Sequence, residues 1–69
     1  MIRREGLMFE NSAQLAAFEW ACDKAITLAR QRPECADVRY LSVIVYEKFP
    51  ECAGGTALWM AREALKRAR

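Results

Sequence analysis

The sequence lacks histidine altogether and has little glycine, proline or cysteine, with three, two and three of these among 69 residues. Histidine is the commonest metal ligand and the commonest general acid–base at neutral pH, so its absence argues against most catalytic and zinc-binding arrangements. Gly54-Gly55 also lacks the Lys-Ser/Thr that a phosphate-binding loop needs. We therefore expect a protein that is not an enzyme and that binds no cofactor or metal.

Long apolar runs are also missing. The longest unbroken run is Val43-Ile44-Val45-Tyr46, far short of the ~18 residues of a membrane span. The start of the chain, Met1-Ile2-Arg3-Arg4-Glu5-Gly6, is positively charged but is followed by no long apolar segment, so it does not resemble a secretory signal. We expect a cytoplasmic protein without membrane contact.

The cysteines are odd in number and widely spaced, at Cys22, Cys35 and Cys52. A disulfide framework favours an even set, and a zinc site favours closely paired cysteines. The spacing therefore predicts reduced, partly buried thiols, with a Cys35–Cys52 disulfide as the alternative.

The abundant residue is alanine, which occurs 12 times, largely at positions that would share a face with other apolar residues of a helix. A chain of this length forms one domain, and its core rarely supplies more than ~3–5 kcal/mol. Small side chains bury little apolar area each, at ~25 cal/mol per Å². We therefore predict one all-α domain over residues 1–69, a helical hairpin or three-helix unit completed by homodimerisation.

The helix signals differ in strength along the chain. Residues 1–10 form a short leader, either an arm or a strand. Asn11 and Gln14 have the spacing of a capping box before an amphipathic helix that Pro33 ends. The middle segment 33–50 favours a helix, for which Pro33-Glu34 is a good opening and Asp37 a second possible cap. The β-branched residues of 38–46 leave an α+β fold with a strand there as the alternative.

A last helix is predicted over 57–69, after a turn at Gly54-Gly55 and with Thr56 as its cap. The apolar faces of the three predicted helices supply the candidate core or dimer residues. These are Leu15, Phe18, Cys22, Ile26, Leu41, Val45, Phe49, Leu58 and Leu65.

Two tryptophans fall on the polar faces of their predicted helices. Such residues either pack on another part of the fold or a second subunit, or they bind a partner, because Trp, Tyr and Arg are enriched at binding hot spots. We therefore predict a protein-interaction role, with partner-binding candidates Trp20, Arg39, Tyr40, Tyr46, Trp59 and Arg62.

A second hypothesis is a small helix-turn-helix-like DNA-binding regulator that uses 57–69 as its recognition helix. The segment from Arg62 to Arg69 carries a net charge of +3, counting four cations and one glutamate. The whole chain carries only +2, which offers little phosphate neutralisation, and basic residues are common at helix C-termini for dipole reasons alone. Nucleic-acid binding is therefore the weaker of the two hypotheses.

From Met1-Ile2-Arg3-Arg4-Glu5-Gly6 to Lys66-Arg67-Ala68-Arg69, the chain resembles the small quorum-sensing anti-activator proteins that temperate phages make early in infection. The resemblance covers the full length and includes no signature motif. It implies a helical dimer that binds and blocks a LuxR-type transcription activator of the bacterial host. It also implies a second host target, the ATPase of type IV pilus assembly.

Overall fold

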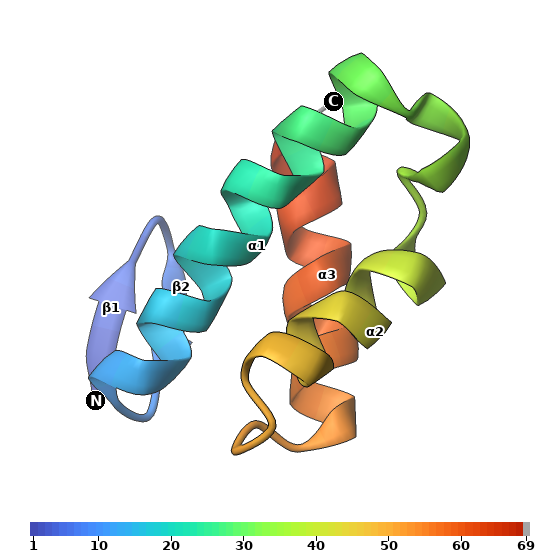
Figure 1. Ribbon diagram of the computed structural model, residues 1–69. Helices are drawn as coiled ribbons and strands as arrows, with labels where there is room; N and C mark the ends of the chain where they lie inside the picture. The colour runs from blue at the N-terminus through green and yellow to red at the C-terminus, as the bar shows by residue number, and fades with distance from the viewer. Residues whose placement is uncertain (69) are drawn as a thin grey trace.

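The computed structural model describes residues 1–68 and contains a β-hairpin followed by three helices (Figure 1). In chain order the elements are β1 (Ile2–Arg4), β2 (Leu7–Phe9), α1 (Ser12–Gln31), the 3₁₀ turn η1 (Pro33–Cys35), α2 (Val38–Lys48) and α3 (Gly54–Ala68). Helix α3 packs against both α1 and α2. The predicted small helical domain is confirmed, and the leader is a hairpin packed on α1.

The hairpin has antiparallel strands in which Ile2 pairs with Phe9 and Arg4 with Leu7. Its two-residue turn consists of Glu5 and Gly6, whose φ angles are 54° and 81°. Positive φ at both central residues suits the right-handed twist of the flanking strands. Glycine adopts this conformation without strain, whereas a glutamate does so at some cost.

The predicted cap of α1 is confirmed. Asn11 Oδ1 accepts a hydrogen bond from the Gln14 amide at 2.9 Å. Gln14 Oε1 accepts one from the Glu10 amide, also at 2.9 Å, so the glutamine side chain reaches one residue further back than in a capping box. These two bonds fix the point at which the hairpin passes into the helix.

The buried face of α1 lies within the predicted apolar side but leaves part of it exposed. Ile26 was expected among the core or dimer residues, yet it is exposed, as is Ala29. The helix instead turns its alanines inward because they allow the backbone of α3 to approach closely, and the bulkier Ile26 stays outside. The buried residues of α1 are Ala17, Phe18, Ala21, Ala25 and Leu28.

Segment 38–46 lies within helix α2, so the strand alternative is wrong. Of the two predicted starts the helix uses Asp37, whose Oδ1 accepts a hydrogen bond from the Arg39 amide at 2.7 Å, whereas Pro33-Glu34 lies in the separate turn η1. Leu41 and Val45 are fully buried against the other helices. This segment has apolar residues at both odd and even positions because they lie on two opposite faces of one helix.

Helix α3 begins earlier than predicted, at Gly54 rather than residue 57, so neither the glycine turn nor the Thr56 cap is correct. The turn that precedes the helix lies at residues 49–52, where the Cys52 amide donates a hydrogen bond to the Phe49 carbonyl at 3.0 Å. Leu58, a predicted core or dimer residue, is exposed, because the buried face of α3 follows its alanines. Its buried residues are Ala57, Met60, Ala61, Ala64 and Leu65.

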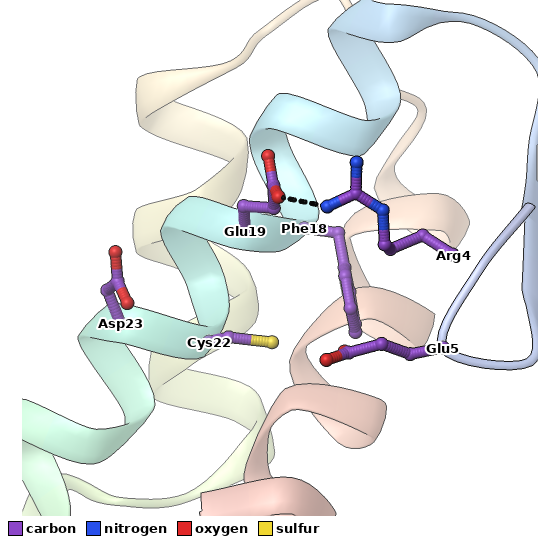
Figure 2. Close-up of a pocket in the computed structure, with 6 residues that line it drawn as sticks. All are labelled: Arg4, Glu5, Phe18, Glu19, Cys22 and Asp23. Carbon is purple, nitrogen blue, oxygen red and sulfur yellow. Dashed lines mark hydrogen bonds and ion pairs between the residues drawn. The ribbon is translucent and has the colours of Figure 1, made fainter. Parts of the chain in front are cut away.

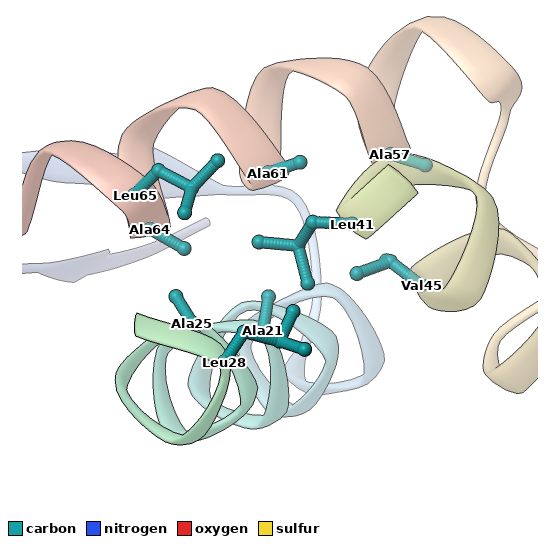
Figure 3. Packing of buried hydrophobic residues seen from close by; sticks show 9 residues of the cluster. All are labelled: Ala21, Ala25, Leu28, Leu41, Val45, Ala57, Ala61, Ala64 and Leu65. Carbon is teal, nitrogen blue, oxygen red and sulfur yellow. The ribbon is translucent and has the colours of Figure 1, made fainter. Parts of the chain in front are cut away.

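The buried residues form two clusters. The alanine core lies between the three helices (Figure 3) and consists of Ala21, Ala25, Leu28, Leu41, Val45, Ala57, Ala61, Ala64 and Leu65. The aromatic core lies at the hairpin end and consists of Phe9, Ala17, Phe18, Cys52 and Met60, with Trp59 partly buried against it. Both clusters are entirely apolar, since residues 1–68 include no buried polar or charged side chain.

Candidate functional site

Among residues 1–68, the largest group of exposed large apolar side chains on one helix lies on α2. Tyr40, Val43 and Tyr46 are 41%, 56% and 47% exposed. Because successive residues of a helix are rotated by about 100°, all three lie within about 60° of the direction of Val43, opposite Leu41 and Val45. Arg39 and Glu47 lie within about 40° of the same direction. We call these five residues, Arg39, Tyr40, Val43, Tyr46 and Glu47, the α2 outer face.

A hollow of about 490 Å³ lies along the α2 outer face where α3 begins. It is lined by Ser42, Val43, Tyr46, Glu47 and Gly54. Gly54 contributes no side chain, and an added Cβ there would meet no atom within 4 Å. The hollow therefore has room for an apolar or aromatic side chain from a binding partner.

Charges mark the two ends of this face. Arg39 lies in the first turn of α2 and Glu47 in the last, and both are exposed. Among residues 1–68 the five ion pairs involve other side chains, so neither charge is neutralised within the chain. An apolar strip bounded by one cation and one anion is the arrangement that fixes the orientation of a docked helix.

The two tryptophans have a different role. Trp20 packs its ring edge-on against Phe49, with centroids 5.9 Å apart and an interplanar angle of 71°. Trp59 packs against Phe9, with centroids also 5.9 Å apart. Both indoles are half-buried and contribute to packing within the fold, as the packing alternative predicted.

The structure therefore brings three of the six predicted partner-binding residues together. Arg39, Tyr40 and Tyr46 share the α2 outer face, whereas Trp20 belongs to α1, and Trp59 and the exposed Arg62 belong to α3. The sequence reasoning missed Val43 and Glu47. Plotting residues 39–47 at helical spacing would have found both, because that plot separates the outer face from Leu41 and Val45.

A second cavity, of about 370 Å³, lies between the hairpin turn and α1 (Figure 2). Arg4 and Glu19 pair across it at 3.0 Å, and the Cys22 and Glu5 side chains extend toward each other. Burial raises the pKa of the Cys22 thiol, and the nearby Glu5 carboxylate raises that pKa further. The thiol is therefore protonated at neutral pH, which makes it a poor nucleophile.

The other two cysteines are also free thiols, so the alternative Cys35–Cys52 disulfide is not formed. Burial raises the pKa of Cys52, which lies in the aromatic core. Within the described part of the chain, no group of three or more His, Cys, Asp or Glu side chains is placed to hold a metal ion. None of the helices in residues 1–68 combines the length and apolarity needed to cross a membrane.

The basic end of α3 is largely neutralised by neighbouring carboxylates. Arg67 pairs with Glu63 at 3.1 Å and with Glu5 at 3.6 Å, and Lys66 pairs with Glu63 at 3.4 Å. Recognition helices read bases mainly with their N-terminal residues, which in α3 begin with Gly54 and Gly55. This geometry does not favour the DNA-binding hypothesis.

In comparisons with known proteins, no family model, no curated protein and no solved structure matches this chain.

Proposed function

We propose that this protein is a non-enzymatic inhibitor that binds another protein through the α2 outer face. The observation that carries the proposal is the gathering of Tyr40, Val43 and Tyr46 on one exposed side of a single helix. Contiguous exposed apolar side chains bounded by charges are typical of interaction surfaces. Tyrosine and arginine are also enriched among the residues that dominate binding energies.

The opposite side of α2 supports the proposal because it holds the helix rigidly. Leu41 and Val45 are completely buried in the alanine core, and Asp37 caps the first turn. The outer side chains are therefore presented from a fixed backbone, so little conformational entropy is lost when a partner docks.

The resemblance to phage anti-activator proteins gives the proposal its partners. The first is a LuxR-type transcription activator, and the second is the ATPase of type IV pilus assembly, both in the cytoplasm of an infected bacterium. The mechanism is occlusion, in which the α2 outer face covers a surface that the activator needs for dimerisation or DNA binding. Such inhibition requires no bond to be made or broken by the inhibitor.

Binding of the purified chain to a purified LuxR-type activator tests the proposal by calorimetry. Tyr46→Ala is expected to weaken binding at least tenfold, about 1.4 kcal/mol. The matched control is Ile26→Ala, which also removes an exposed apolar side chain but from α1. Equal affinities for Tyr46→Ala and the control would exclude the α2 outer face, and no binding by the unmodified chain would exclude this class of partner.

A further inference from the structure

The hollow beside the α2 outer face combines apolar walls with a single charged side chain. Its lining consists of Ser42, Val43, Tyr46, Glu47 and Gly54, of which only Glu47 is a charged residue type. Within residues 1–68 none of the five ion pairs includes Glu47, so its carboxylate is available to a bound group. The hollow therefore favours a ligand that is apolar along part of its length and positively charged at one end.

The hydrogen-bonding character of the lining points to the same kind of ligand. Ser42 Oγ donates its hydrogen to the Arg39 carbonyl at 2.9 Å, so toward the hollow this oxygen offers only lone pairs. The carboxylate of Glu47 also accepts and does not donate. A bound group that satisfies both side chains must therefore be a donor, and a guanidinium has five N–H donors and no acceptor.

The helix ends beside the hollow do not reverse its charge. Glu47 belongs to the last turn of α2, where the carbonyls form the negative end of the helix dipole, whereas Gly54 begins α3 at the positive end of its dipole. Each end is equivalent to roughly half a charge, and the two have opposite signs. The Glu47 carboxylate therefore sets the charge of the hollow, and it repels an anionic side chain.

From this lining we propose that the partner of the α2 outer face inserts an arginine side chain into the hollow. The apolar stem of the arginine lies against Val43 and against Gly54, where an added Cβ would meet no atom within 4 Å. The planar guanidinium lies over the Tyr46 ring as a cation–π contact and donates hydrogen bonds to the Glu47 carboxylate. Arginine is the side chain that combines an apolar stem, a stacking cation and a fork of donors that matches a carboxylate.

Other side chains fit the hollow less well. The ammonium of lysine is strongly hydrated and lacks the planar shape that stacks on a ring. A purely apolar or aromatic side chain would fill the space but would cover Glu47 without giving it a partner, which costs free energy. The inference rests on the proposed function, because it names the group by which the α2 outer face recognises its partner.

NMR titration of the isotope-labelled chain tests the hollow without any partner protein. The probe is N-acetylarginine methylamide, and saturable shifts are expected for the amides of Val43, Tyr46, Glu47 and Gly54, with a dissociation constant in the millimolar range. The matched probe is N-acetylcitrulline methylamide, which has the same shape without the charge and should bind about tenfold more weakly.

Two variants locate the binding at Glu47. Glu47→Gln should reduce the affinity for the arginine compound to that for the citrulline compound, whereas Glu10→Gln removes an exposed carboxylate before α1 and should change nothing. Glu47→Gln is expected to fold, because the dipole of α2 disfavours an anion in its last turn, and circular dichroism provides the check. The inference is overturned if the hollow shows no saturable shifts, if both compounds bind equally, or if arginine binding survives Glu47→Gln.

Binding to a purified LuxR-type activator separates this inference from the proposed function. Glu47→Gln should weaken that binding about tenfold, as loss of a charge-assisted hydrogen bond does, and Glu10→Gln should leave it unchanged. Activator binding that depends on Tyr46 but not on Glu47 would overturn the arginine inference and leave the proposed function standing. Binding of the arginine compound in the hollow without any binding of the activator would count only against the proposed class of partner.

Discussion

The two cores of this protein achieve close packing in opposite ways. The alanine core consists largely of methyl groups, with five alanines among its nine members, and the backbones of α1 and α3 approach each other across them (Figure 3). The aromatic core instead surrounds the rings of Phe9 and Phe18, whose centroids lie 5.2 Å apart. The alanine core therefore depends on small side chains that let the helix backbones approach, and the aromatic core depends on large rings that fill the space between the elements.

This difference predicts opposite sensitivities to substitution. A buried aromatic ring removes 150–250 Å² from water, several times more than an alanine methyl does. Truncation should therefore damage the aromatic core most, whereas enlargement should damage the alanine core. The short hairpin supplies the Phe9 ring, which contributes much of the buried apolar area of the aromatic core.

The largest effect is expected from Phe9→Ala, because Phe9 is completely buried between α1 and α3. Loss of a buried phenylalanine side chain costs about 3–5 kcal/mol, which is comparable with the whole stability of a domain of this size. Circular dichroism at 25 °C should show a largely unfolded chain. Met8→Ala is the control, since Met8 is exposed on the same strand; equal melting temperatures for the two variants would contradict the proposed role of the aromatic core.

Ala21→Leu is expected to have the next largest effect, through overpacking of the alanine core. Ala21 has no exposed surface, so the extra methylene groups must push α1 away from its neighbours, at about 1–3 kcal/mol. The melting temperature should fall by about 4–8 °C for each kcal/mol. Ala16→Leu, at an exposed position of the same helix, should change it little. A stabilised Ala21→Leu variant would show that the helices have space to spare.

The contrast between the cores also explains what the sequence could predict. Capping by Asn11, the middle helix and its inner residues Leu41 and Val45 followed from local spacing, and the structure confirms all of them. Asp37 was one of two possible starts of that helix, and the structure selects it. The apolar side of α1 also followed, but the exposure of Ile26 did not, because a hydrophobic pattern ranks isoleucine above alanine. Only the close approach of α3 shows that Ile26 is on the outside.

The hairpin and the full composition of the α2 outer face were not predicted either. The residues Glu5-Gly6 do not clearly predict a turn, since glutamate is uncommon at positive φ. Tertiary contacts of Phe9 and Glu5 help to hold the turn in the folded chain. Tyr40 and Tyr46 were identified as binding candidates by residue type. That they share a face with Val43 follows from helical spacing once residues 39–47 are known to be helical, which the sequence left open against a strand.

Arg67→Gln should have a smaller effect that is confined to the hairpin end. The Arg67 guanidinium lies 5.5 Å from the centre of the Phe18 ring and donates to the Glu5 carbonyl at 3.0 Å, which holds the turn against α3. A cation–π contact of this kind contributes about 0.5–1 kcal/mol. Hydrogen exchange of the hairpin amides should accelerate while that of α2 stays unchanged. Lys66→Gln is the control, and equal exchange in both variants would show that Arg67 does not hold the hairpin.

The smallest expected effect is a dependence on pH that involves Glu63. Hydrogen bonding from Arg67 lowers the pKa of Glu63 below its ordinary value of 4.5, against the opposing effect of burial. A carboxyl group with a lowered pKa in the folded state stabilises the fold fully above its unfolded pKa and loses that contribution as the pH falls through the folded value. Glu63→Gln should therefore lower the melting temperature slightly at pH 7, and this difference should shrink as the pH falls through the lowered pKa of Glu63 and its carboxyl becomes neutral. The difference should also shrink at high salt, because Lys66 and Arg67 contribute through screened charges. A difference in melting temperature that stays constant from neutral to acidic pH would mean that Glu63 stabilises the fold by packing and not by its charge.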